Sequence, residues 1–496
     1  MDPLSQSHFH QRVHDQLYGH ILPFWCGPAL DHEQGGWMAW LANDLTPDRT
    51  QPKGLIVNSR ILWAFSAVYQ AKPHALYRQM AERAFEVVRN RFWDQDNGGA
   101  FWQLTGDGCV LDDSKKTYGQ AFYIYALAEY HHAFATGAKA VSASVVGQSV
   151  PAAAVPAGVS PAGRLGRRHT HPPTAGETPA ATAAAGTDCP TTLAAAAGTD
   201  CPTTLAAAAG TDCPTTLAAA AGTDCPTAPA LARAIELFEL IERHAHDPQH
   251  GGYFEVRRRD WSEAANSQLS TKDMDTAKSM NNHLHVLEAY TNLFRVWPDP
   301  RVAQRLRELI ALFEQRILDS RTHHLHHFFD EGWQVRSDTY TFGHDIEGSW
   351  LLCEAAEVLG DEALLTRVHA LALCMAEAVL TEGVDRDGGL CYEGQAGKII
   401  DAGKECWPQA EAVVGFLNAF QLSGDARFLQ AARRVWRYIE DHLVDRIHGE
   451  WFWRINPDGG PDPKLPKVSE WKGPYHGTRA CLETLHRLEL LRAASA

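Results

Sequence analysis

The chain has 496 residues, of which 45% are hydrophobic and 21% are charged, and its formal net charge is −15. This composition is typical of a globular protein with a large core, and the negative charge argues against nucleic acid or an anionic membrane surface as a partner. The first residues lack the basic and apolar regions of a signal peptide, and no transmembrane-length apolar run follows, so we expect a cytoplasmic protein.

Helix-period apolar patterns occur at twelve places along the chain. In chain order they cover about 6–20, 59–72, 76–91, 117–135, 230–245, 279–296, 300–317, 344–358, 361–381, 407–421, 426–442 and 475–490. The links between them alternate between short and long. Twelve helices with six long loops predict six helical repeats.

Residues 137–229 are rich in alanine, proline, threonine and glycine and nearly free of aromatic residues. A Gly-Thr-Asp-Cys-Pro-Thr motif recurs there at Gly186, Gly198, Gly210 and Gly222. Its four cysteines would suit a metal or redox array, but the composition favours a disordered low-complexity insert. We therefore expect one domain over residues 1–496 that this insert interrupts.

Seven further cysteines are scattered without Cys-x-x-Cys spacing. They fit reduced structural thiols, and no disulfide framework or zinc knuckle is visible. These cysteines are Cys26, Cys109, Cys353, Cys374, Cys391, Cys406 and Cys481.

Each long loop carries a similar aromatic signature. The six copies read DHEQGGWMAW, DQDNGGAFW, DPQHGGYFEV, the degraded DSRTHHLHHFF, DRDGGLCYE and DRIHGEWFW. Gly36 and Gly99 are 63 residues apart, whereas Gly99 and Gly252 are 153 apart, and the excess of 90 matches the insert. The insert therefore interrupts one repeat of a regular array.

Six helix pairs bury their apolar faces by closing into a ring, so we predict an all-α fold, an (α/α)6 barrel. The helices that follow the long loops begin with polar and aromatic residues. We expect their first turns to line an open mouth that is roofed by loops with short β-hairpins. The insert would lie at the opposite face.

Three histidines stand near the starts of these helices. His344 shares a helix face with Glu347 and Trp350, which suggests either a general base oriented by its carboxylate or a capped helix start with an ion pair. His285 shares a face with Asn281 and Glu288, whereas His283 points elsewhere. His476 follows Pro474 and Tyr475 at the start of the last inner helix. Three histidines at one level of a ring predict a catalytic site.

Aromatic residues near the same helix starts indicate a sugar ligand, because indole rings pack against the C–H faces of sugars. The candidates are Tyr118, Trp350, Trp407 and Trp471, with Glu411 beside Trp407. Trp63 suits the core equally well. Arg60 stands at an inner helix start, where a guanidinium would stabilise a developing oxyanion.

Six segments resemble the cellobiose 2-epimerase branch of the N-acylglucosamine 2-epimerase family, and together they span nearly the whole chain outside the insert. They are KGLIVNSRILWAFSA, TYGQAFYIYALAEY, MNNHLHVLEAY, GHDIEGSWLL, CWPQAEAVVGF and WKGPYHGTRACLE. The resemblance implies acid/base roles for His344 and His476, a supporting role for His285 and an enediolate-facing role for Arg60. It also implies sugar-contacting or orienting roles for Asn281, Glu347, Trp407, Glu411 and Trp471.

The implied reaction is epimerisation at C2 of the reducing-end glucose of β-1,4-linked disaccharides, from cellobiose to glucosylmannose and from lactose to epilactose. One histidine removes the C2 proton of the open-chain sugar, and the other returns a proton to the opposite face. Neither a cofactor nor a metal is required. The expected partner is a small sugar, and the oligomeric state, monomer or homodimer, stays open.

Four alternatives remain at this level. They are a mannose or N-acetylglucosamine epimerase or isomerase, a glycoside hydrolase using Glu347 and Glu411, a metalloenzyme, and a non-catalytic carbohydrate-binding barrel. The metal would be held by His285, His344 and His476, or by the histidines of 323–327.

Deleting residues 138–228 and closing the gap with a short linker should leave folding and sugar turnover nearly unchanged, because disordered segments add little to a core. Soluble yield and epimerisation rate of the deletion variant, compared with the full chain, measure this. Loss of most activity would show that the insert contributes to the enzyme.

Overall fold

The computed structural model describes residues 3–135, 227–270 and 273–493. These residues belong to one compact unit. The predicted insert falls almost entirely outside them, so its expected disorder stays a prediction. The helix before it runs from Thr117 at the mouth to Ala135, which places Ala135 roughly 27 Å away along the helix axis.

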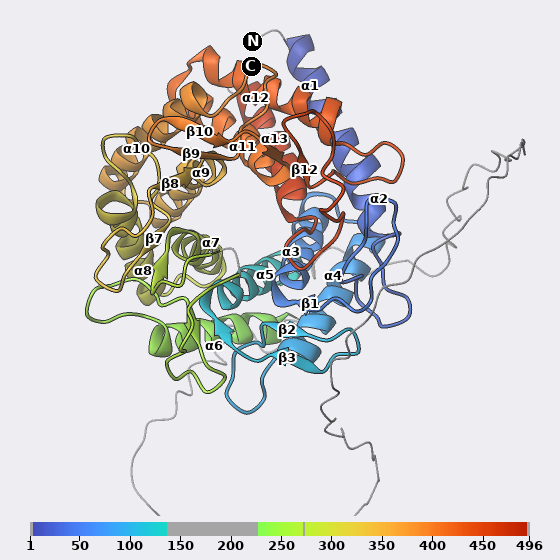
Figure 1. Cartoon of the computed structure of the whole chain (residues 1–496), viewed down its shortest axis with the longest axis vertical. Helices are drawn as coiled ribbons and strands as arrows, with labels where there is room; N and C mark the ends of the chain where they lie inside the picture. Colours follow the sequence, from blue (N-terminus) through green and yellow to red (C-terminus); the bar gives the residue numbers. More distant parts are fainter. Residues whose placement is uncertain (1–2, 136–226, 271–272, 494–496) are drawn as a thin grey trace, which may run out of the picture. The chain divides into compact units, whose positions relative to one another are not determined.

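Six inner helices form a closed ring in the described part of the chain (Figure 1). Each is buried on almost every side of its first turns. Each packs against the next, and the last packs against the first. They are α3 (Leu55–Ala71), α5 (Thr117–Ala135), α7 (Met280–Val296), α9 (Phe342–Leu359), α11 (Cys406–Ser423) and α13 (Tyr475–Ala493).

An outer helix covers each inner helix. α12 shows the pattern, because Phe428, Ala432 and Val435 are buried on one face while Arg427 and Arg434 lie on the other. The outer helices are α1 (Pro3–Gln16), α4 (Ala75–Val87), α6 (Ala228–His244), α8 (Pro300–Leu312), α10 (Glu362–Glu382) and α12 (Ala426–Tyr438). The predicted (α/α)6 barrel is confirmed.

In the described part of the chain, four outer helices continue directly into a π-helical turn after their last α-helical residue. The turns are η1 (Leu17–Ile21), which continues into the short α2 (Leu22–Trp25), η2 (Val88–Phe92), η4 (Phe313–Ile317) and η5 (Ile439–Leu443). α10 is long and apolar enough to cross a membrane by length and composition, yet it packs against α9 within the barrel.

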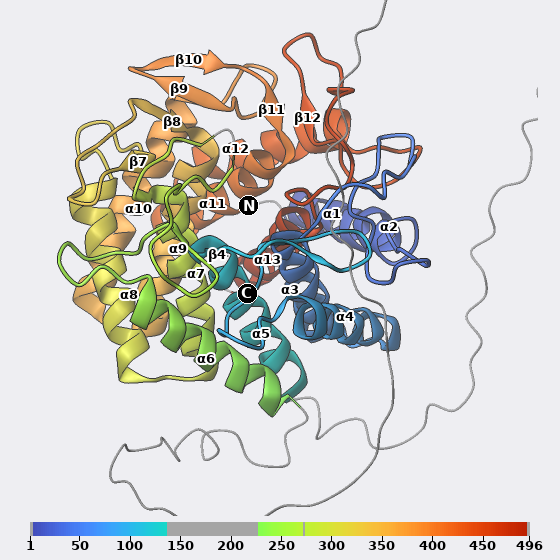
Figure 2. The ribbon, with the colours of Figure 1, turned by 60° about the horizontal axis from the view of Figure 1, so that its bottom comes forward.

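Short strands lie in the long loops and gather at one end of the ring (Figure 2). Among the described residues, two loops form the expected hairpins from strands of their own, β2–β3 and β9–β10. Elsewhere a strand that directly precedes an inner helix pairs with a strand of the next loop, and a bridge from Leu41 to Val468 joins the first loop to the last. The loops are therefore stitched to one another around the mouth.

The strands are all short. They are β1 (Lys53–Gly54), β2 (Gln103–Leu104), β3 (Val110–Asp112), β4 (Lys115–Lys116), β5 (Val256–Arg257), β6 (Lys278–Ser279), β7 (Phe328–Phe329), β8 (Thr339–Thr341), β9 (Glu393–Gln395), β10 (Lys398–Asp401), β11 (Lys404–Glu405) and β12 (Arg454–Ile455).

The six aromatic signatures form six equivalent turns, each closed by a backbone hydrogen bond from its aspartate. In the third copy the Asp247 N–H donates to the Gly252 carbonyl at 2.8 Å. Gly252 has φ +78°, and a Cβ there would lie 2.5 Å from His283 Nε2. The glycine is therefore required both by the left-handed backbone and by the close approach of the inner helix.

A lysine before the inner helix anchors the turn in five of the six loops. Lys278, on β6, donates to Asp247 Oδ2 at 2.6 Å and to the carbonyls of Gly251 and Glu331, both at 2.8 Å. Both charged side chains are buried. The equivalent pairs are Lys53–Asp31, Lys115–Asp94, Lys404–Asp385 and Lys467–Asp445.

Replacing Lys278 by methionine should lower the free energy of unfolding by about 3 kcal/mol, because it leaves Asp247 buried without its counter-charge. Urea denaturation followed by circular dichroism measures the change. Lys398→Met is the matched control, since Lys398 is exposed on β10 and should cost less than about 0.5 kcal/mol. Equal stability of the two variants would contradict an anchoring role.

Candidate active site

A cavity of about 1270 Å³ opens where the first turns of the inner helices meet the loops. Nine of the eleven predicted site residues line it: Arg60, Tyr118, Asn281, His285, His344, Glu347, Trp407, Trp471 and His476. The other two, Trp350 and Glu411, are buried behind its wall. The mouth is therefore where the sequence predicted it.

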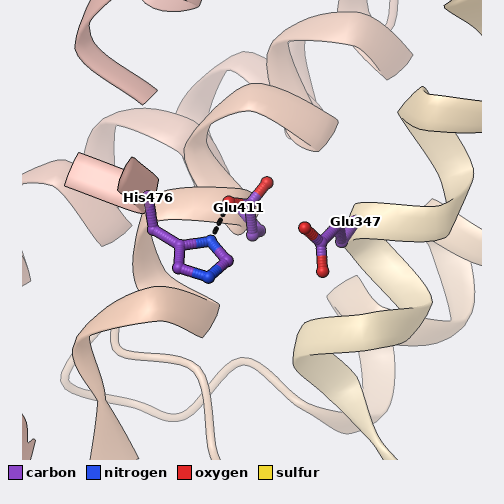
Figure 3. Close-up of side chains that lie close together, drawn as sticks. All are labelled: Glu347, Glu411 and His476. Carbon is purple, nitrogen blue, oxygen red and sulfur yellow. Dashed lines mark hydrogen bonds and ion pairs between the residues drawn. The ribbon is translucent and has the colours of Figure 1, made fainter. Parts of the chain in front are cut away.

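His476 is backed by a carboxylate from the neighbouring inner helix. Its Nδ1 lies 2.6 Å from Glu411 Oε1 (Figure 3). Burial lowers the pKa of His476 well below 6.5, and the charges of Arg60 and Arg479 lower it further. The ring is thus a neutral imidazole at neutral pH. The resemblance implied a sugar-contacting or orienting role for Glu411, which hydrogen-bonds this histidine and does not line the cavity.

His344 is backed by a hydroxyl. Its Nδ1 lies 2.6 Å from Thr341 Oγ1, so the expectation that Glu347 orients this histidine is wrong. The side chain of Glu347 turns to Arg479, while Thr341, at the N-cap position of α9, is the residue that contacts His344. Burial lowers the pKa of His344 well below 6.5, and the nearby His327 adds to the effect.

The Trp407 ring lies between the two histidines. Its centroid is 4.7 Å from that of His344 and 5.6 Å from that of His476. A Cβ at Gly343 would come 2.6 Å from the indole, so only glycine admits the ring at this place. The Trp407 Nε1–H donates to Glu405 at 3.0 Å, which fixes the plane of the indole.

A buried arginine that sequence reasoning missed lies beneath the cavity. Arg479, on α13, hydrogen-bonds Glu288 of α7 and Glu347 of α9, and lies 2.7 Å from Glu411 of α11. It also bonds the Tyr475 hydroxyl, which in turn donates to Glu288. Arg479 follows His476 by three residues, so helical spacing already placed it on the same face.

One guanidinium does not balance three carboxylates. Burial opposes ionisation of Glu288, but Arg479 and His285 outweigh it and lower its pKa to about 2. The pKa values of the other two carboxyl groups are raised instead. Burial and the charge of Glu411 raise the pKa of Glu347 to about 7. Burial also raises the pKa of Glu411. The cluster therefore retains a proton near neutral pH.

His285 lies 2.8 Å from Glu288 through its Nδ1, on the helix face predicted from the spacing. His283 points away, as expected: its Nε2 accepts the Tyr253 N–H at 2.8 Å and locks the third loop. Asn281 lines the cavity, and its Oδ1 has no hydrogen-bond partner among the described residues. A sugar hydroxyl would satisfy that oxygen.

Arg60 is held from two sides. Nη1 donates to the Trp471 carbonyl at 2.9 Å and Nη2 to the Tyr118 hydroxyl at 3.0 Å. Its guanidinium lies 4.5 Å from the centroid of the Phe122 ring. Burial raises the pKa of Tyr118 to about 12, so the phenol stays neutral. A positive group is thus fixed in the cavity wall without a carboxylate partner among the described residues.

Indole rings form much of the outer wall. Trp471 lies 5.8 Å from Trp102, centroid to centroid, and Trp453 also faces the cavity. Trp102 and Trp453 were not predicted, although both belong to the aromatic loop signatures. Trp63 is a core residue, stacked on Tyr125 at 5.4 Å.

Glu347, Glu411 and His476 have ligand atoms within 4.8 Å of one another, a spacing that suits a metal ion (Figure 3). Arg479, however, donates to Glu347 and contacts Glu411, so its positive charge already stands where a cation would be attracted. The donor set therefore fits a guanidinium better than a metal. Of the suggested histidines in 323–327, His324 pairs with Asp345 and His327 with Thr341.

Comparison with known proteins gives a consistent result. The N-acylglucosamine 2-epimerase (GlcNAc 2-epimerase) family matches residues 36–150 and 214–480. A cellobiose 2-epimerase from Bacteroides fragilis is 34% identical over 476 residues, covering 96% of this chain and 98% of the relative.

Two solved structures are similar along almost the whole chain. A cellobiose 2-epimerase from Bacillus thermoamylovorans B4167 has a TM-score of 0.74 at 31% identity, covering 97% of this chain and 100% of that one. One from Spirochaeta thermophila DSM 6192 has a TM-score of 0.74 at 32% identity, with 99% of both chains covered. The chain is thus an isomerase that belongs to the N-acylglucosamine 2-epimerase family and resembles its cellobiose 2-epimerases over its full length.

Proposed function

We propose that the protein interconverts the C2 epimers of the reducing-end glucose in β-1,4-linked disaccharides, turning cellobiose into glucosylmannose and lactose into epilactose without a cofactor. The similarity to cellobiose 2-epimerases supports a disaccharide 2-epimerase. One observation carries the mechanism: two half-buried imidazoles flank Trp407 and face one cavity, each with Nδ1 already engaged.

The chemistry needs two bases on opposite faces of C2. Ring opening frees the C1 carbonyl, which then accepts the electron pair of the broken C2–H bond and gives an enediolate. One histidine takes that proton, and the other, as an imidazolium, returns a proton to the opposite face. The site holds the same number of protons before and after the reaction. Which histidine serves which epimer stays open.

The proton for the second histidine has a holder in the same cluster. Glu347 has a pKa of about 7, and its carboxyl lies within 4.8 Å of the ligand atoms of His476 and Glu411. Its Oε2 has no partner among the described residues. We assign Glu347 the role of storing this proton. The two histidines do not hold it in the free enzyme, because their pKa values are lowered.

Arg60 suits the enediolate oxygen. A fixed guanidinium costs no reorganisation when negative charge develops. The indoles of Trp407 and Trp471 would pack against the sugar rings, and Asn281 would bind a hydroxyl. Trp350, expected from the sequence to bind the sugar, has a buried ring instead, and its Nε1–H donates to Glu411 at 3.2 Å.

A glycoside hydrolase is disfavoured by the carboxylates themselves. Hydrolysis needs two carboxyl groups that flank the scissile bond. Glu347 and Glu411 instead share Arg479, and only Glu347 lines the cavity.

Replacing either histidine by asparagine should abolish net epimerisation of cellobiose, because each base serves one face of C2. In D2O, one variant should still exchange the C2 proton of the gluco sugar and the other that of the manno sugar, unless the lost histidine also opens the ring. Proton NMR of the reducing end measures both reactions. His250→Asn, at an exposed histidine outside the cavity, is the control and should match the parent. Near-parental epimerisation by His344→Asn or His476→Asn would rule out the two-base mechanism.

The acid limb of the pH profile of kcat/KM should lie below pH 6.5. kcat/KM reports pKa values of the free enzyme, and burial lowers the pKa of both His344 and His476. A base with a lowered pKa keeps its lone pair to lower pH and loses it only on protonation below that pKa. Initial rates with cellobiose between about pH 5 and 8 test this. A limb centred at or above pH 6.5 would contradict the assignment.

A further inference from the structure

A buried hydroxyl links His344 to a second histidine outside the cavity wall. Thr341 Oγ1 lies 2.6 Å from His344 Nδ1 and 3.4 Å from His327 Nε2. Thr341 ends β8 and precedes the first turn of α9, so it occupies the N-cap position. Its side chain makes no capping hydrogen bond. The hydroxyl therefore serves the two imidazoles and not the helix start.

The tautomer of His327 follows from a backbone contact. The Thr341 N–H donates to His327 Nε2 at 3.1 Å, so this nitrogen carries a lone pair and no proton. Burial lowers the pKa of His327 to about 4, which keeps the ring neutral at neutral pH. The one lone pair of His327 Nε2 therefore faces both the Thr341 N–H at 3.1 Å and the Thr341 hydroxyl at 3.4 Å, and the two groups share it.

The hydroxyl has one proton to give and lone pairs to offer. When it donates to His327, its oxygen accepts from His344, and His344 then carries its proton on Nδ1. The remaining nitrogen, Nε2, has no hydrogen-bond partner in the described part of the chain, and the ring lines the cavity. The lone pair of Nε2 is left for the ligand.

We propose that Thr341, oriented by His327, is a positioning residue that holds His344 in the Nδ1–H tautomer and so presents a free Nε2 base to the cavity. The catalytic consequence rests on the proposed function, whereas the tautomer itself does not. Glu411 does the same for His476, because a carboxylate only accepts hydrogen bonds.

The tautomer can be read directly by nitrogen-15 NMR of the histidine-labelled full chain. The His344 signals are identified by their loss in His344→Asn. In the parent, Nδ1 should show the shift of a protonated ring nitrogen and Nε2 that of an unprotonated one. The opposite pattern in the parent protein would overturn the proposal without any variant and without an activity assay.

Variants separate positioning from packing. Thr341→Val keeps the shape and removes the hydroxyl, so the two tautomers of His344 should mix and kcat for cellobiose should fall about tenfold to a hundredfold with KM nearly unchanged. Thr341→Ser retains the hydroxyl and should restore both the spectrum and most of kcat. His327→Phe should act in the same direction as Thr341→Val, and the double variant should lose no more than the larger single effect.

Unchanged kcat and an unchanged His344 spectrum in Thr341→Val would refute the role of the hydroxyl. A parent enzyme that epimerises no disaccharide would instead refute the proposed function, and the tautomer pattern in the parent would still decide the inference.

Discussion

The buried guanidinium of Arg479 holds the active site together. It reaches from α13 to carboxylates on α7, α9 and α11, so one side chain ties four of the inner helices together beneath the cavity. Such a cluster is costly to bury, and it persists only because each charge has close partners. The imbalance of three carboxylates against one arginine has a chemical result. The pKa of Glu347 is raised to about 7, beside the histidines to which we assign the proton transfers.

The stitched loops explain how the mouth keeps its geometry. Each strand that precedes an inner helix is paired with the next loop, and a buried lysine ties most of the turns to the same strand. The first turn of each inner helix, which carries a candidate site residue, therefore starts from a fixed point. In the fourth loop tyrosine replaces the lysine: Tyr340 stacks on His324 with centroids 3.7 Å apart. This degraded signature still positions Thr341 and His344.

Much of the fold could be predicted because its helix pairs and loop turns repeat, and much of the site because its residues lie at equivalent places in those repeats. The helix period and the six loop signatures predict the barrel, and nine candidates reach the cavity because they lie at or just before the starts of its inner helices. Contacts between helices could not be predicted. Glu347 looked like the partner of His344 by spacing, but ring closure brings Arg479 to it and leaves Thr341 for the histidine. Trp350 was misplaced for a similar reason, since only packing shows that its indole bonds Glu411.

The pKa values of the two histidines are lowered by different surroundings. His476 has a carboxylate behind it, which favours the imidazolium, but burial, Arg60 and Arg479 oppose that charge. The Nδ1 of His344 contacts only a hydroxyl. Burial is the largest cause of its lowered pKa, and the further causes are histidines and not an arginine. In the proposed reaction each histidine must serve as base in one direction and acid in the other. A proton passes freely between two such groups only when neither binds it much more tightly. Different surroundings that lower both pKa values suit a reaction that runs in both directions.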